Sequence, residues 1–104
     1  RAPRWHRGAV ACVVMAAPGY PESPVTGGEI SGVGDAVGEA TWVFHAGTRR
    51  DELGALRTAG GRVLDVVARD ASLEEAARRA YAAVAKIRWP GEQHRSDVGT
   101  WGQP

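Results

Sequence analysis

The chain has 104 residues, of which 43% are hydrophobic and 24% are charged. This length suits a single small domain with one core, and the composition is that of a folded protein rather than a disordered one. Thirteen basic residues against 12 acidic ones give a formal net charge of +1. So small a charge excludes the strong positive field that binds nucleic acid or anionic membranes non-specifically.

The first regular element expected is a strand. Residues 1–8 have no periodicity and predict a linker or tail, residues 9–100 predict the domain, and residues 101–104 predict a second tail. Val10 to Ala16 is apolar throughout, which predicts a strand covered on both faces, although so short a run also suits a buried helix. Cys12, the single cysteine, is therefore expected in the core and not as a nucleophile.

Residues 18–38 contain six glycines and three prolines, which predicts a long loop with a possible short edge strand near Glu29 to Ser31. Thr41 to Ala46 alternates in polarity, with Trp42 and Phe44 on one face, and this favours a strand.

A hairpin and a helix follow. Leu53 to Thr58 and Arg62 to Ala68 flank Ala59, Gly60 and Gly61, a spacing that predicts two paired strands with glycine at a positive φ. Ser72 and Glu75 match a capping box, and apolar residues recur at helical spacing from Leu73 to Ile87. We expect an α+β fold that is β-rich, with a mostly antiparallel sheet and one long helix packed against it.

The residues by themselves show no complete active site. The three histidines lack metal-ligand spacing, and the loop Gly32, Gly34, Gly38 precedes a strand where a dinucleotide motif requires a helix. Two segments that combine glycine with arginine remain, residues 58–62 and 94–99. Each suits an anion held by backbone amides and a guanidinium, but the residues alone favour an ordinary turn beside a solvated arginine.

Six blocks in order resemble the C-terminal domain of phosphoribosylamine–glycine ligase, also called glycinamide ribonucleotide synthetase. The blocks are residues 11–16 with the Gly-Tyr-Pro turn at 19–21, residues 28–32, VFHAGT at 43–48, TAGGRVL at 58–64, the helix from Ser72 to Tyr81, and RSDVG at 95–99. Together they cover almost the whole chain. His94 and Ser96 depart from the tyrosine and lysine usual in the last block.

This resemblance implies a hybrid barrel-sandwich fold and a place in purine synthesis. The family joins glycine to 5-phosphoribosylamine with ATP, through a glycyl phosphate, to give glycinamide ribonucleotide. The resemblance implies that ATP and Mg²⁺ bind to the N-terminal and ATP-grasp domains, which lie outside this sequence and are its expected partners. We therefore expect no cofactor in this domain, no activity from it alone, and a cytoplasmic enzyme that binds neither nucleic acid nor membrane.

The resemblance also directs the choice of site residues. The substrate-binding candidates, for phosphoribosylamine or glycine, are Gly60, Gly61 and Arg62, followed by Arg95 and Lys86; none is expected to be catalytic or to bind metal. The alternative is a non-catalytic module that docks on a partner domain through Trp5, Trp42 and Trp89. In either case, we expect the isolated domain to expose an apolar patch and to self-associate.

Overall fold

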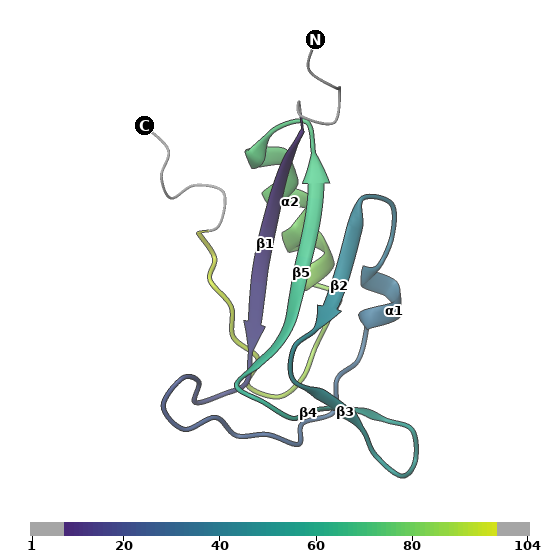
Figure 1. The fold of residues 1–104 in the computed structure, drawn as a ribbon, viewed down its shortest axis with the longest axis vertical. Coiled ribbons are helices and arrows are strands. Elements are labelled where there is room, and N and C mark those ends of the chain that lie inside the picture. Colours follow the sequence, from purple (N-terminus) through teal and green to yellow (C-terminus); the bar gives the residue numbers. More distant parts are fainter. Residues whose placement is uncertain (1–7, 98–104) are drawn as a thin grey trace.

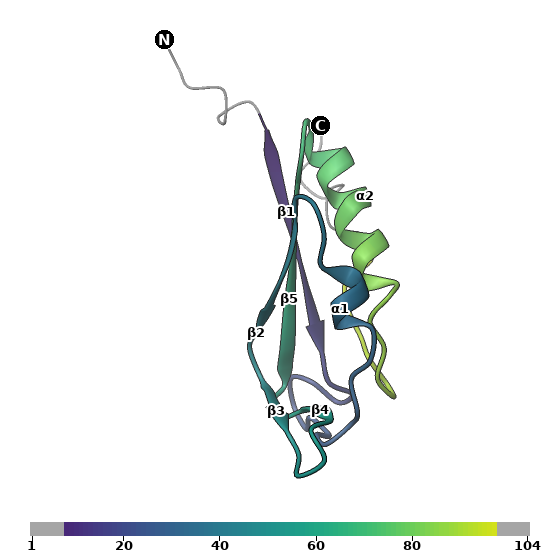
Figure 2. The ribbon, with the colours of Figure 1, turned by 90° about the vertical axis from the view of Figure 1, so that its right-hand side faces the viewer.

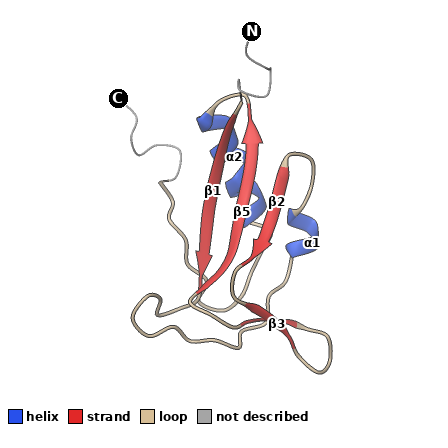
Figure 3. Ribbon diagram, in the orientation of Figure 1, coloured by secondary structure: helices blue, strands red, loops and turns tan. Residues whose placement is uncertain are grey.

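The computed structural model describes residues 8–97. Its elements follow the chain as β1 (Ala9–Ala16), α1 (Val33–Ala36), β2 (Thr41–His45), β3 (Thr48–Arg50), β4 (Leu56–Thr58), β5 (Arg62–Asp70) and α2 (Leu73–Val84) (Figure 1). The long stretches before α1 and after α2 are mostly loop (Figure 3). The predicted Trp5 anchor and the two tails lie wholly or largely outside the described residues.

An antiparallel sheet with strand order β1-β5-β2 forms the body of the domain. The nine residues of β5 supply the centre, and α2 covers one face of the sheet (Figure 2). The core lies between them and includes Val13, Met15, Leu64 and Val66, each fully buried. The α+β class, the antiparallel sheet and the single long helix are confirmed, while the sheet formed by residues 8–97 stays open and does not close into a barrel.

The predicted pairing of residues 53–58 with residues 62–68 is wrong. β4 pairs with β3 in a separate two-stranded sheet, and β5 pairs with β1 and β2 instead. At the centre of the larger sheet, β5 forms hydrogen bonds along both of its edges and buries its apolar face under α2. Pairing with β4, which has only three residues, would give fewer hydrogen bonds and less burial. The turn at residues 59–61 therefore connects two sheets, and neither of its glycines has a positive φ.

The strand predicted at residues 10–16 is confirmed, but it is covered on one face only. Ala11, Val13 and Met15 face the core, whereas Val10, Cys12 and Val14 are exposed. The prediction that Cys12 is a core residue is therefore wrong. A run without polar residues does not reveal how many faces of a strand have a covering layer.

The helix begins as the sequence predicts. Ser72 Oγ accepts a hydrogen bond from the Glu75 amide at 3.1 Å and donates one to Glu75 Oε1 at 3.2 Å. The helix ends at Val84, before the expected Ile87, because Ser31 and Arg88 exchange backbone hydrogen bonds of 2.9 Å each and draw the chain away from the helix axis. Glu29 and Ser31 make single β-bridges rather than the predicted edge strand.

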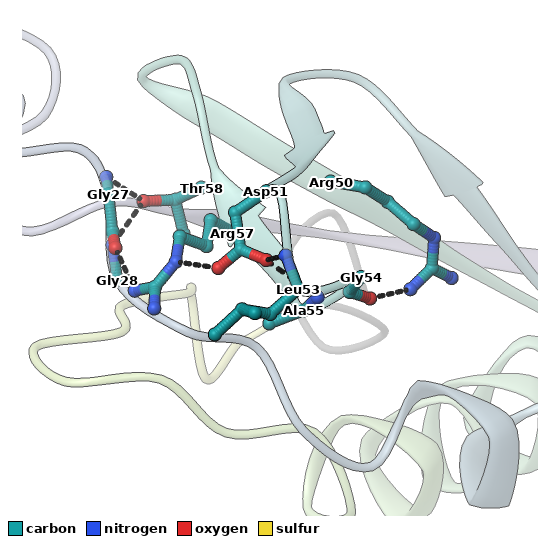
Figure 4. Close-up of polar contacts among 9 residues, drawn as sticks. All are labelled: Gly27, Gly28, Arg50, Asp51, Leu53, Gly54, Ala55, Arg57 and Thr58. Atoms are coloured by element: carbon teal, nitrogen blue, oxygen red, sulfur yellow. Dashed lines mark hydrogen bonds and ion pairs between the residues drawn. The ribbon is translucent and has the colours of Figure 1, made fainter.

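A polar network fastens the β3–β4 sheet to the preceding loop (Figure 4). Asp51 accepts from the amides of Leu53 and Ala55, both at 2.9 Å, and from Arg57 Nε at 2.7 Å. Arg57 Nη1 in turn donates to the Gly27 carbonyl at 2.8 Å. Buried Thr58 accepts from the amide of Gly27 at 2.9 Å, so the small sheet and the loop at residue 27 form one unit.

The second face of the large sheet has no covering element among the described residues (Figure 2). We call it the open face and define it by Val10, Cys12, Val14, Trp42, Phe44, Asp65, Val67 and Arg69, which lies opposite Val10. Trp42 and Phe44 remain 45% and 55% exposed. Trp89, the other described tryptophan expected as a docking anchor, is instead buried in the core, which corrects that prediction.

Candidate substrate site

A depression lies where the end of β1 and the start of β5 meet the segment after α2. Its volume is about 410 Å³, and it is lined by Val14, Ala16, Tyr20, Arg62, Gln93, His94 and Arg95. We call it the arginine depression. The same three segments converge at the lower end of the sheet in Figure 1.

Backbone pairing brings these distant segments together. Ala16 lies opposite Arg62 in the sheet and exchanges backbone hydrogen bonds with Gln93, at 2.8 and 3.1 Å. The side-chain amide of Gln93 donates to the carbonyls of Ala17 at 2.8 Å and Tyr20 at 3.2 Å. One glutamine thus fixes both the segment that carries Arg95 and the turn that carries Tyr20.

The two arginines of the depression differ in their partners. Arg95 donates twice to Asp97, at 2.9 and 2.6 Å, and this carboxylate raises the pKa of Arg95 while Arg95 lowers the pKa of Asp97. Arg62 is exposed and has no carboxylate partner within residues 8–97. The Arg62 guanidinium is therefore available for an external anion.

His94 adds a third nitrogen-bearing group. Its Nδ1 lies 2.5 Å from Glu92 Oε2, and its ring is 6.0 Å from that of Tyr81, centroid to centroid. The Tyr81 hydroxyl donates to the Arg95 carbonyl at 2.7 Å, which ties the segment to α2. Guanidinium groups beside an imidazole suit a phosphate or a carboxylate.

Only some of the five predicted substrate-binding residues lie at the arginine depression. Arg62 and Arg95 both line the arginine depression. Gly61 borders it: the Gly61 carbonyl accepts from the Ala17 amide at 2.8 Å, and a Cβ at Gly61 would overlap the Tyr20 ring. Gly60 does not line the depression and lies beside Gly47. Lys86 lies elsewhere, in a depression with Asp35, where its ammonium donates to the Asp35 carbonyl at 3.4 Å.

Tyr20, Gln93 and His94 are not among the site residues predicted from the sequence, although His94 lies in the candidate anion segment 94–99. Tyr20 belongs to the Gly-Tyr-Pro block, where a packing role had the stronger support. Gln93 carries no sequence signal, since its role depends on backbone carbonyls contributed by a distant turn.

Residues 10–101 match the model of the phosphoribosylglycinamide synthetase C domain. The chain belongs to this family. Its predicted membership is confirmed, and the match takes in every residue of the arginine depression.

Members of the phosphoribosylglycinamide synthetase family with close sequences include ligases of bacteria and plants. The phosphoribosylamine–glycine ligase of Phenylobacterium zucineum is 53% identical over 97 residues, which cover 93% of this chain and 23% of that protein. The chloroplastic ligase of Arabidopsis thaliana is 45% identical, over 91% of this chain and 18% of that protein. The chain thus spans about a quarter or less of the length of these relatives.

A solved structure agrees with the fold. The crystal structure of the phosphoribosylamine–glycine ligase from Thermotoga maritima superposes with a TM-score of 0.75 at 37% identity, covering 86% of this chain and 21% of the other. Within residues 8–97, no helix is long and apolar enough to cross a membrane.

Proposed function

We propose that this domain forms one wall of the site in which a phosphoribosylamine–glycine ligase makes glycinamide ribonucleotide. In that reaction the glycine carboxylate takes the γ-phosphate of ATP to give glycyl phosphate and ADP. The amine of 5-phosphoribosylamine then attacks the acyl carbon, and phosphate leaves. The relatives' names support the reaction, and the arginine depression supports the wall.

Arg62 carries the proposed binding role. Its guanidinium is exposed in the depression without a carboxylate partner among the described residues, and it extends from the first position of β5. A planar guanidinium binds a phosphate or a carboxylate through two parallel hydrogen bonds. Arg62 would hold the phosphate of phosphoribosylamine or the carboxylate of glycine, with Arg95 beside it. Gly60 and Gly61 would give the turn its shape, and Lys86 is a weaker candidate because it lies in another depression.

The described residues do not form a site suited to Mg²⁺. No group of three His, Cys, Asp or Glu side chains between residues 8 and 97 is placed to hold a metal ion. Mg²⁺ takes carboxylate and phosphate oxygens in an octahedral arrangement. We assign ATP and Mg²⁺ to the N-terminal and ATP-grasp domains of the ligase, which makes those domains partners of this one and leaves this domain inactive alone.

The test uses a chimaeric ligase in which this chain replaces the matched 97-residue segment of the Phenylobacterium enzyme. We expect Arg62→Ala to raise KM for phosphoribosylamine or glycine, or to lower kcat, by roughly 10- to 100-fold, the usual effect of losing a charge-assisted hydrogen bond. Arg62→Lys should lose less. Steady-state kinetics with each substrate varied in turn would measure both constants.

The matched control is Arg78→Ala, which removes an exposed arginine from α2, paired with Glu74 at 3.5 Å and outside the arginine depression. It should leave both constants unchanged. If Arg62→Ala behaves like Arg78→Ala in the folded enzyme, Arg62 has no part in the site.

A second candidate is the non-catalytic docking module, and the exposure of Trp42 and Phe44 favours it. It makes the opposite kinetic prediction. Substitutions in the arginine depression would leave KM and kcat unchanged, while substitutions on the open face would weaken the binding of this domain to its partner domain.

A further inference from the structure

Asp65 occupies an unusual place in the open face. It lies in the middle strand, and its cross-strand neighbours in register are Val14 on β1 and Phe44 on β2. Its Oδ1 atom is shielded from solvent and has no hydrogen-bond partner among residues 8–97. A carboxylate oxygen held between apolar side chains loses water without gaining a donor, which costs free energy in the domain by itself.

The next row of the open face is apolar throughout. Cys12, Val67 and Trp42 lie side by side one step along the strands, and Val10 extends the surface on β1. Contiguous apolar side chains around one shielded acid form the pattern of an interface whose partner supplies the missing donor.

The open face is continuous with the arginine depression, because Val14 belongs to both. A partner that covers the open face therefore also reaches the edge of the proposed substrate site. The relatives carry more than three quarters of their length outside the matched segment, so the same polypeptide can supply such a partner.

We infer that the open face docks against the rest of the ligase and that this partner brings an arginine or lysine side chain to Asp65. The inference rests on the proposed function for the identity of the partner. The donor is cationic because its acceptor is a carboxylate, and the contact around it is apolar because Val14, Trp42 and Phe44 surround it.

Cys12 provides a probe that needs no change to the face. It is exposed there and is the only cysteine of the chain. We expect iodoacetamide to alkylate Cys12 readily in the isolated chain at a concentration low enough to keep it monomeric, and at least 10-fold more slowly in the chimaeric ligase. The Cys12 peptide would be quantified by mass spectrometry at one fixed alkaline pH, because burial and then Asp65 raise the pKa of this thiol.

The matched control places the cysteine on the opposite layer, in Ala82→Cys with Cys12→Ser. Ala82 is exposed on α2, and its alkylation rate should be equal in the isolated chain and the chimaera. Equal Cys12 rates in the two proteins would overturn the docking inference. Another outcome is that Cys12 becomes protected from alkylation only in the isolated chain, as its concentration rises, and not in the chimaera. That result would show that a second copy of this chain, and not the ligase, covers the open face.

The substitution Asp65→Asn tests whether the partner brings an arginine or lysine side chain to Asp65. Asp65→Asn should raise, at least threefold, the ratio of the Cys12 alkylation rate in the chimaera to the rate in the isolated chain. This ratio cancels the direct effect of Asp65 on the pKa of the thiol, and Asp35→Asn, a change to an exposed carboxylate on α1, should leave the ratio unchanged. In the isolated chain Asp65→Asn should leave the thermal midpoint unchanged or raise it, because no partner is lost. Asp65 would be a structural residue if Asp65→Asn lowered the thermal midpoint of the isolated chain and left Cys12 protected in the chimaera. This result would overturn the proposed contact between Asp65 and a cationic side chain of the partner.

The two proposals fail separately. Arg62→Ala should impair catalysis in the chimaera and leave Cys12 protected. An active chimaera with a fully reactive Cys12 would retain the proposed function and remove the docking face.

Discussion

Gly32 is the N-cap of α1, and its backbone lies against the backbone of Lys86, just after α2. Its φ is 88°, in the left-handed region, and a Cβ built on it would overlap the carbonyl of Lys86. The backbone at this point runs beside the segment where Ser31 and Arg88 pair. The residue therefore has both a conformational and a spatial reason to be glycine.

We predict that Gly32→Ala lowers the free energy of unfolding by about 2–3 kcal/mol, because left-handed strain and the overlap with Lys86 act together. Gly34 on α1 is the matched control, since a Cβ there meets nothing within 4 Å. Gly34→Ala should be neutral or stabilise by up to roughly 1 kcal/mol. Urea unfolding of both variants measures the difference, and equal effects would contradict the role of Gly32.

The β3–β4 sheet depends on ionised Asp51. Hydrogen bonds from Arg57 and from the amides of Ala55 and Leu53 lower the pKa of Asp51 in the folded state. A group with a lowered folded pKa stabilises the fold fully above its unfolded pKa, near 4, and this contribution is lost as the pH falls through the folded value.

We predict that Asp51→Asn lowers the thermal midpoint at pH 7 and that its deficit relative to the natural sequence shrinks below about pH 4. Glu52→Gln, an exposed change in the same hairpin, should have no such pH dependence. Thermal melts from pH 7 to about pH 2.5 would decide. A deficit for Asp51→Asn that is equal across this range would show that its charge does not hold the hairpin.

Residues 8–97 build a three-stranded sheet with a helix layer on only one side, and a small two-stranded sheet lies at its end (Figure 2). A second apolar face is left to solvent, which is uncommon for a domain that functions alone. The arginine depression opens at the edge of the same face, through Val14.

We predict that the isolated chain binds an apolar dye such as anilinonaphthalene sulfonate through the open face and self-associates as its concentration rises. Phe44→Asp should reduce both, since Phe44 belongs to a contiguous apolar surface. Leu53→Asp is the control, because Leu53 is 94% exposed but lies alone at the hairpin tip. Dye fluorescence and light scattering measure the two effects, and equal responses of the two variants would argue against a contiguous patch.

Local patterns were sufficient for several elements and for the family. The capping residues Ser72 and Glu75 started α2 as expected, and alternation around Trp42 identified β2, because both signals depend on neighbours within a few residues. Ordered blocks such as residues 43–48 led to the family without any contact being known.

The tertiary structure alone decided which strands pair, which faces are covered and which residues meet. The partner of β5 depended on burial across the whole sheet, so the local hairpin signal at Gly60 and Gly61 was misleading. Cys12 is exposed because none of the elements that the structure describes forms a second layer over β1. Arg62 and Arg95 converge only because Gln93 is hydrogen-bonded to the end of β1, a contact between distant segments that no local pattern encodes.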